Sequence, residues 1–189
     1  MSREALVYST LVHKALDFAA VVHARQFRKD RHRNIPYVSH AAMVAHILEK
    51  SGFDADIVAA GALHDTLEDT YATREMLERE FGPRVAELVD NVTEQDKSLP
   101  WEERKARYHE RLRTAPFEAL AISCADKTHN LWSLVLYHRA GHDVWDIVKR
   151  GRDAQISRME KMAELYRERL NHPIRGLFEQ ALAVLKKEC

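Results

Sequence analysis

Cysteine, glycine and proline are all scarce in this sequence. The 189 residues include 2 cysteines, 6 glycines and 5 prolines. Cys124 lies in an apolar stretch and Cys189 is the last residue, so neither a disulfide-stapled scaffold nor a cysteine zinc site is expected. Such low cysteine usage is typical of a reducing compartment, and we expect a cytoplasmic protein.

The sequence also lacks an excess of charge and any long hydrophobic run. Lysine plus arginine and aspartate plus glutamate each number 29, so the formal net charge is zero. General nucleic-acid binders usually show a clear basic excess, and we therefore expect no nucleic-acid partner. No apolar run approaches the ~20 residues of a membrane-spanning helix. The N-terminal segment carries Glu4 and no long apolar stretch, which argues against a secretion signal, and we expect no membrane association.

Helical periodicity dominates what is present. Apolar residues recur at spacings of three and four, as in Leu11, Ala15, Phe18 and Val22, and no alternating strand pattern of useful length occurs. The predicted helices cover about residues 5–27, 40–50, 54–63, 73–81, 83–92, 102–113, 117–137, 143–170 and 174–187. We predict an all-α fold, a compact single-domain helical bundle over residues 1–189.

Helix boundaries follow from capping residues. Ser39, Asp54 and Thr73 are expected N-caps because their side-chain oxygens accept from free N–H groups of the first turn. Pro83 suits the first position of a helix, where its missing N–H costs nothing. Asp143 follows a glycine and is interpreted as a further cap, although it forms a His-Asp pair with its neighbour.

The segment from His64 to Asp69 concentrates titratable groups at the end of an apolar helix. His64 is expected on an inward face, and Asp65 adjoins it. If the helix continues, Glu68 lies four residues after His64, and Asp69 lies four residues after Asp65, so all four share one region of its surface. Burying several acids without a cation is costly. We favour a divalent metal over the alternative of a solvated helix end.

Isolated polar residues on apolar helix faces are the candidates for further metal ligands. Asp126 interrupts the apolar helix 117–137, and Asn130 follows one turn later. A carboxylate there either pairs with a base such as Lys127 or binds a metal. His40 is the other candidate, although a histidine at a helix start is often structural. Two imidazoles and two carboxylates form a nitrogen–oxygen set that suits Mn²⁺, Fe²⁺ or Co²⁺.

A basic stretch precedes the helix predicted over residues 40–50. From Arg25 to Arg33 there are five lysines or arginines against one acid, Asp30. In a chain of zero net charge, such a stretch is expected to attract an anionic substrate. The alternative is a merely solvated loop.

The histidines, carboxylates and basic residues described above lie in blocks whose sequences and order resemble those of the hydrolase domain of RelA/SpoT-type proteins, within the HD-domain phosphohydrolase superfamily. The chain is similar to the small alarmone hydrolases, which include the metazoan SpoT homologues. The matching blocks, over about residues 10–135, are His23–Asp30, Tyr37–His40, His64–Thr70, Phe81–Val85, Val92–Thr93 and Ala125–Leu131. The helical part at about residues 143–189 diverges.

The resemblance implies an enzyme that removes the 3′-pyrophosphate from a purine nucleotide alarmone, (p)ppGpp or (p)ppApp, giving pyrophosphate and a nucleoside 5′-phosphate. Its substrate partner is a small-molecule nucleotide. It implies one metal ion, usually Mn²⁺, held by His40, His64, Asp65 and Asp126. It assigns Glu68 and Asp69 to activation of the attacking water, and Arg28, Lys29 and Asn130 to contacts with the nucleotide.

Two alternatives stay open at this stage. One is an HD-domain phosphohydrolase acting on another nucleotide, such as a 5′-nucleotide or NADPH. The other is a catalytically dead nucleotide-binding module. Ala41 stands where the family usually has proline, and beyond Tyr137 the pocket residues are not placed. Arg150, Arg152 and Arg158 are basic candidates there, but a solvated helix face is the favoured interpretation.

Overall fold

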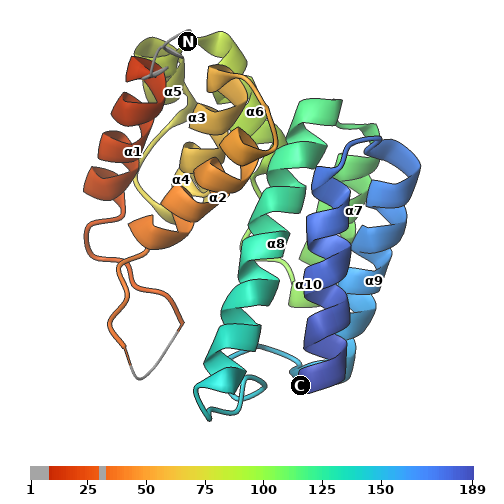
Figure 1. The fold of residues 1–189 in the computed structure, drawn as a ribbon. Coiled ribbons are helices and arrows are strands. Elements are labelled where there is room, and N and C mark those ends of the chain that lie inside the picture. The colour runs from red at the N-terminus through yellow and green to blue at the C-terminus, as the bar shows by residue number, and fades with distance from the viewer. Residues whose placement is uncertain (1–8, 30–32) are drawn as a thin grey trace, which may run out of the picture.

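Helices make up all the regular structure in the part of the chain that the structure describes (Figure 1). The computed structural model describes residues 9–29 and 33–189. Its helices are α1 (Thr10–Val22), α2 (Val38–Lys50), α3 (Ala55–Leu63), α4 (Thr66–Asp69), α5 (Arg74–Phe81), α6 (Pro83–Val92), α7 (Trp101–Thr114), α8 (Phe117–Arg139), α9 (Gly151–Arg169) and α10 (Ile174–Glu188). The predicted all-α class is confirmed. Within the described ranges, an isolated bridge between Phe27 and Pro36 is the only pairing of extended segments.

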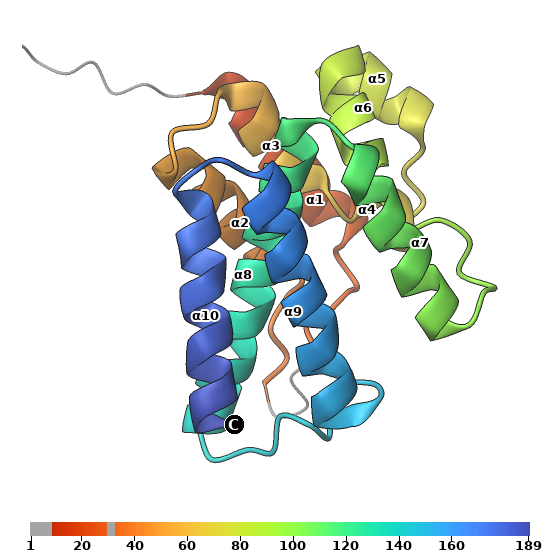
Figure 2. The same ribbon diagram turned by 90° about the vertical axis from the view of Figure 1, so that its right-hand side faces the viewer.

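Helix α8 lies at the centre of the bundle. Figures 1 and 2 show it between α2 and α3 on one side and α9 and α10 on the other, with α7 along α9. Its first half, from Ala119 to Ala125, is buried at every position, as expected of a helix that is covered all round. The core extends from Ala15 in α1 to Leu185 in α10. A single domain over residues 1–189 stays a prediction.

Several predicted boundaries are confirmed. Asp54 caps α3, because its Oδ1 accepts from the N–H groups of Asp56 and Ile57, each at 3.1 Å. Thr73 caps α5 in the same way through Met76. Gly82 separates α5 from α6 with φ of 86°, a left-handed conformation that glycine adopts without strain. Pro83 then occupies the first turn of α6, as predicted.

Two predicted boundaries in the N-terminal half are wrong. Positions 5–8 of the first predicted helix lie outside the described residues, and α1 ends at Val22, not at 27. The chain instead turns back, and Arg28 N–H donates to the Ile35 carbonyl at 2.9 Å. The second helix begins at Val38 with no side-chain cap, so Ser39 is not its N-cap.

The helix that ends at His64 does not continue through Asp69. Two carbonyl groups of its last turn accept hydrogen bonds from side chains: His64 Nδ1 donates to the Gly61 carbonyl, and Thr66 Oγ1 donates to the Leu63 carbonyl. Side-chain hydrogen bonds of this kind compete with helical ones. The chain bends at Asp65, and α4 starts as a separate turn.

The helix predicted over 143–170 begins only at Gly151. Asp143 accepts from Trp145 N–H in a turn and caps no helix. Arg150, directly before this helix, has φ of 75°, and a left-handed residue interrupts a right-handed helix. The resulting loop, residues 140–150, lies at the end of the bundle beside the C-terminus (Figure 1).

Gly61 sets how closely α2 and α3 pack. A Cβ at this position would overlap the Leu48 side chain of α2, so the two helices meet through backbone on one side. His40 and His64 belong to these two neighbouring helices. Among the described residues, no helix is both long and apolar enough to cross a membrane.

Candidate metal centre and substrate cavity

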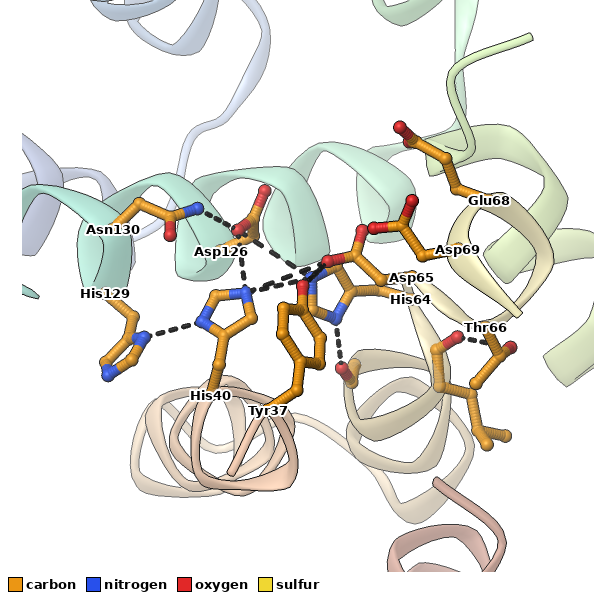
Figure 3. A network of polar contacts seen from close by, with 12 residues as sticks. Tyr37, His40, His64, Asp65, Thr66, Glu68, Asp69, Asp126, His129 and Asn130 are labelled. Carbon is orange, nitrogen blue, oxygen red and sulfur yellow. Dashed lines mark hydrogen bonds and ion pairs between the residues drawn. The ribbon is translucent and has the colours of Figure 1, made fainter. Parts of the chain in front are cut away.

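Three helices deliver four side chains to one point (Figure 3). His40 comes from the first turn of α2, His64 and Asp65 from the end of α3, and Asp126 from the middle of α8. His40 Nε2 lies 3.2 Å from His64 Nε2 and 3.1 Å from Asp126 Oδ1. His64 Nε2 lies 3.1 Å from Asp65 Oδ2. The structure thus brings together all four residues that the sequence proposed as ligands.

The imidazole rings are fixed by their outer nitrogens. His64 Nδ1 lies 2.8 Å from the Gly61 carbonyl oxygen. A carbonyl only accepts, so Nδ1 carries a hydrogen and Nε2 is the nitrogen that faces the other ligands. His40 Nδ1 lies 2.6 Å from His129 Nδ1, which turns His40 Nε2 toward the same point. Metal-binding histidines are commonly oriented by such outer hydrogen bonds.

The spacing of the donor atoms fits a divalent ion. Donors bonded to a metal at about 2.1 Å stand about 3 Å apart when their bonds are at right angles. His40 Nε2 lies 4.0 Å from Asp65 Oδ2, and His64 Nε2 lies 3.7 Å from Asp126 Oδ1. Ligand atoms of His40, His64 and Asp65 all lie within 4.8 Å of one another. Nitrogen and carboxylate oxygen donors suit first-row divalent metals.

Burial and charge act in opposite directions on the two histidines. Burial lowers the pKa of His40 to about 4. Burial also acts to lower the pKa of His64, but the charges of Asp65 and Asp126 raise it to about 10. The Asp65 pKa is held below its usual value, because the His64 charge outweighs burial. Without a metal, the two carboxylates therefore retain a positive charge on His64.

Both carboxylates are anchored from outside. Tyr37 donates its hydroxyl hydrogen to Asp65. Lys127 Nζ lies 2.5 Å from Asp126 Oδ2, and the Asp126 charge raises the Lys127 pKa against the opposing effect of burial. One Asp126 oxygen therefore pairs with Lys127, as one of the two sequence interpretations predicted, and the other faces the histidines, where metal binding stays a prediction.

Glu68 and Asp69 lie on α4 beside this cluster (Figure 3). Because α3 ends before them, they are held by the loop after α6 and not by helical stacking on His64. Glu94 N–H donates to Glu68 Oε2 at 3.2 Å, and Lys97 pairs with Asp69. Burial, followed by the charges of Glu94 and Asp65, raises the pKa of Glu68 to about 7. A carboxyl that titrates near neutrality is suited to proton transfer.

His64, Asp65, Asp126, Glu68 and Asp69 line a cavity of about 850 Å³, a volume typical of small-molecule sites. Arg28, Lys29 and Arg33 from the basic stretch line it as well, whereas Asp30 and Arg31 lie outside the described residues. Arg28 Nη2 donates to Asn130 Oδ1 at 2.8 Å, and Asn130 Nδ2 donates to Asp126 Oδ1 at 2.5 Å. Asn130 therefore joins the basic loop to the ligand cluster.

Some residues of the site were not assigned a role from sequence. Tyr37 and His129 both occur inside the matching blocks, and His129 lies one turn from Asp126, which is the signal that could have found it. Glu94 sits in a polar loop without any distinguishing pattern. Arg158 lines the cavity, whereas Arg150 pairs with Glu102, so the solvated-face interpretation is wrong for Arg158.

Comparison with known proteins agrees with this geometry. The family model described as HD domain matches residues 15–153. The chain is 36% identical over 170 residues to guanosine-3′,5′-bis(diphosphate) 3′-pyrophosphohydrolase MESH1 of Danio rerio, covering 82% of this chain and 92% of that protein. It is 42% identical over 123 residues to MESH1 of Homo sapiens, covering 64% of this chain and 68% of that protein.

A solved structure gives the same result for the fold. It is a metazoan orthologue of SpoT, described as hydrolysing ppGpp, and it superposes with a TM-score of 0.80 at 32% identity. The match covers 95% of this chain and 97% of that one. The chain therefore belongs to the HD domain family, and within it to the RelA/SpoT-type group that includes the metazoan SpoT homologues.

Proposed function

We propose that this protein is a metal-dependent hydrolase that removes the 3′-pyrophosphate from (p)ppGpp or (p)ppApp, releasing pyrophosphate and the nucleoside 5′-phosphate. The observation that carries the proposal is the convergence of two imidazoles and two carboxylates at a cavity lined by cations. The names of the relatives, guanosine-3′,5′-bis(diphosphate) 3′-pyrophosphohydrolases, support the choice of substrate. The low cysteine content is the support for placing the activity in the cytoplasm.

In this proposal, His40, His64, Asp65 and Asp126 hold one divalent ion, and Mn²⁺ is the ion we expect. When bound, such an ion lowers the pKa of water and neutralises charge that develops on phosphoryl oxygens. The chain contributes the orientation of the ligands. His64 Nδ1 is fixed by the Gly61 carbonyl and His40 Nδ1 by His129, so little rearrangement is needed on binding.

Glu68 is the proposed general base. With its pKa raised to about 7 by burial and by Glu94, it accepts a proton from water at neutral pH. Asp69, tied to Lys97, orients the same water. The water oxygen joins the phosphorus next to the ribose, and the bond from that phosphorus to the 3′ oxygen breaks. The released 3′ oxygen takes a proton and becomes the ribose hydroxyl.

Arg28 and Lys29 are the proposed phosphate contacts on the wall formed by the loop before α2. Burial, followed by the charges of Lys149 and Arg28, lowers the pKa of Lys29, which is the expected effect of holding several cations close together. A bound polyphosphate relieves this repulsion. Asn130 is the third proposed contact, and it also positions Arg28 through their hydrogen bond.

The test is a product assay with the purified chain and Mn²⁺. ppGpp, ppApp, NADPH and nucleoside monophosphates are supplied in parallel, and pyrophosphate and inorganic phosphate are measured separately. We expect pyrophosphate from ppGpp or ppApp. Release of inorganic phosphate alone would identify a different phosphohydrolase, and tight nucleotide binding without turnover would identify a binding module.

A further inference from the structure

A second group of cations lines the cavity on the wall formed by α7, α8 and α9. We call it the α7–α9 cluster, and it consists of Arg104, Lys105, Lys127 and Arg158. None of the four is among the residues proposed above to bind substrate. Lys127 pairs with Asp126, and Arg104 and Lys105 share Glu94. The four cations are thus paired with only two carboxylates, Asp126 and Glu94, which leaves two positive charges of the cluster without a counter-charge in these ion pairs.

Arg158 is the member without a partner. Among the described residues it forms no hydrogen bond and no ion pair, although it is half-buried at the cavity. Its charge acts to lower the pKa of Lys29, Lys105 and Lys127, so it lies within electrostatic reach of cations on both walls. An arginine that approaches three lysines without a carboxylate is destabilising unless an anion joins them.

The pairs around Glu94 are also incomplete. Arg104 Nε lies 3.4 Å from Glu94 Oε2, yet neither buried atom has a hydrogen-bond partner within residues 9–29 and 33–189. Burial and the Arg158 charge lower the pKa of Lys105 to about 8. Native structures seldom leave buried polar groups unsatisfied. Of the two unsatisfied atoms only Arg104 Nε is a donor, so the α7–α9 cluster holds one N–H group that a further acceptor atom would satisfy.

The location of the cluster indicates which anion it receives. Glu94 holds Glu68 through its backbone N–H, and Lys127 holds Asp126. The cluster thus adjoins both the proposed base and the proposed metal ligands. Arg28 lies on a different wall, where it contacts Asn130 and Ser133 further along α8. A substrate with phosphates at two ends would meet one group of cations at each end.

We propose that Arg158 and Lys105 bind the distal phosphate of the 3′-pyrophosphate, the phosphate that is not attacked and that leaves within the pyrophosphate product. The inference rests on the proposed function and assigns a second subsite to it. Hydrogen bonds from a guanidinium and an ammonium group to one phosphate are charge-assisted, and such bonds are stronger than those between neutral groups. This subsite distinguishes a 3′-pyrophosphate from a 3′-monophosphate.

The test measures binding with the full, metal-loaded chain carrying Glu68→Gln, so that nucleotides stay intact. Calorimetry compares three ligands: ppGpp, its analogue without the distal 3′ phosphate, and its analogue without the distal 5′ phosphate. Arg158→Gln is expected to weaken the binding of ppGpp, and of the analogue without the distal 5′ phosphate, by about 10- to 100-fold. The affinity for the analogue without the distal 3′ phosphate should change by less than about 3-fold, because this ligand lacks the phosphate that Arg158 would contact.

Arg158→Lys should restore most of the affinity, because a cation remains. Lys161→Gln is the matched control, since Lys161 is exposed on the same helix and does not line the cavity. Lys105→Gln is a second variant, and a melting curve shows whether it folds. Equal losses for all three ligands, or no loss, would overturn the subsite. If wild type releases no pyrophosphate while the ligand pattern holds, the subsite stands and the proposed reaction fails.

Discussion

The two polar regions of the cavity differ in how complete they are. In the imidazole–carboxylate cluster, nearly every polar atom already has a protein partner, from Gly61 behind His64 to Lys127 behind Asp126. In the α7–α9 cluster, the described residues give Arg158 no hydrogen bond or ion pair and leave Arg104 Nε unsatisfied. The first arrangement is preorganised for a small ion, whereas the second requires a large anion to complete it. Variants that remove one charge from each region separate these roles.

Asp126→Asn should have the largest effect. It removes a carboxylate that faces both histidines and leaves the buried Lys127 without its counter-charge, which is strongly destabilising. We expect metal content close to zero and a loss of turnover on the order of 1,000-fold or more. Elemental analysis and the pyrophosphate assay measure the two effects. Asp54→Asn, at the cap of α3, is the control and should keep both metal and activity.

Glu68→Gln should lower turnover by about 100- to 1,000-fold while stabilising the fold. The folded-state pKa of about 7 exceeds the usual value of 4.5, so ionising Glu68 costs folding free energy as pH rises between these values. Glutamine removes that cost, and we expect a Tm higher by about 2–5 °C at pH 8. The difference should vanish below pH 4.5. Wild-type kcat/KM should rise through about pH 7.

A matched control for this variant is Glu87→Gln, at an exposed position on α6. It should change neither turnover nor the pH profile. A Glu68→Gln protein that keeps wild-type activity, or that melts lower at pH 8, would contradict the role given to this residue.

His129→Phe should weaken metal binding by about 10- to 100-fold, a typical cost of losing an outer-shell partner. An aromatic ring is kept, but His40 Nδ1 loses the nitrogen that lies 2.6 Å away. Metal titration by calorimetry gives the affinity, and turnover at saturating metal should largely recover. His46→Phe, exposed on the same helix as His40, is the control. An unchanged affinity would mean that His40 needs no support.

Arg28→Gln should have the smallest effect. We expect KM for ppGpp to rise about 10-fold, because one charged contact to phosphate is lost. Metal content and kcat should change by less than about 3-fold. Arg84→Gln, which breaks exposed ion pairs with Asp54 and Asp56, should leave KM unchanged. Loss of metal in Arg28→Gln would show that the imidazole–carboxylate cluster depends on the basic stretch, to which Asn130 joins it.

Most of the helices and the four converging side chains could be predicted from the sequence. Asp126 was recognisable because a carboxylate on an otherwise apolar helix face needs a partner. Capping residues such as Asp54 and Thr73 fixed boundaries because their hydrogen bonds are local. Local chemistry of this kind is fully contained in neighbouring residues.

What could not be predicted depends on distant contacts. The break after His64 follows from side chains that take carbonyls of the last turn, although the sequence pattern favours a longer helix. Glu94 acts on Glu68 across 26 positions, and nothing in its own neighbourhood marks it. Arg158 has the pattern of a surface helix, and only the packing of α9 against α7 brings it to the cavity.

The glycine at position 61 has a consequence for the His64 ring. Its missing side chain lets α3 rest directly on Leu48 of α2, while its carbonyl clamps the ring three residues later. The position of the His64 ring is thus tied to the backbone of the residue that packs against Leu48. Replacing this glycine with alanine would force the Leu48 side chain to move, and any displacement of the Gly61 carbonyl would be passed to the ring that donates to it.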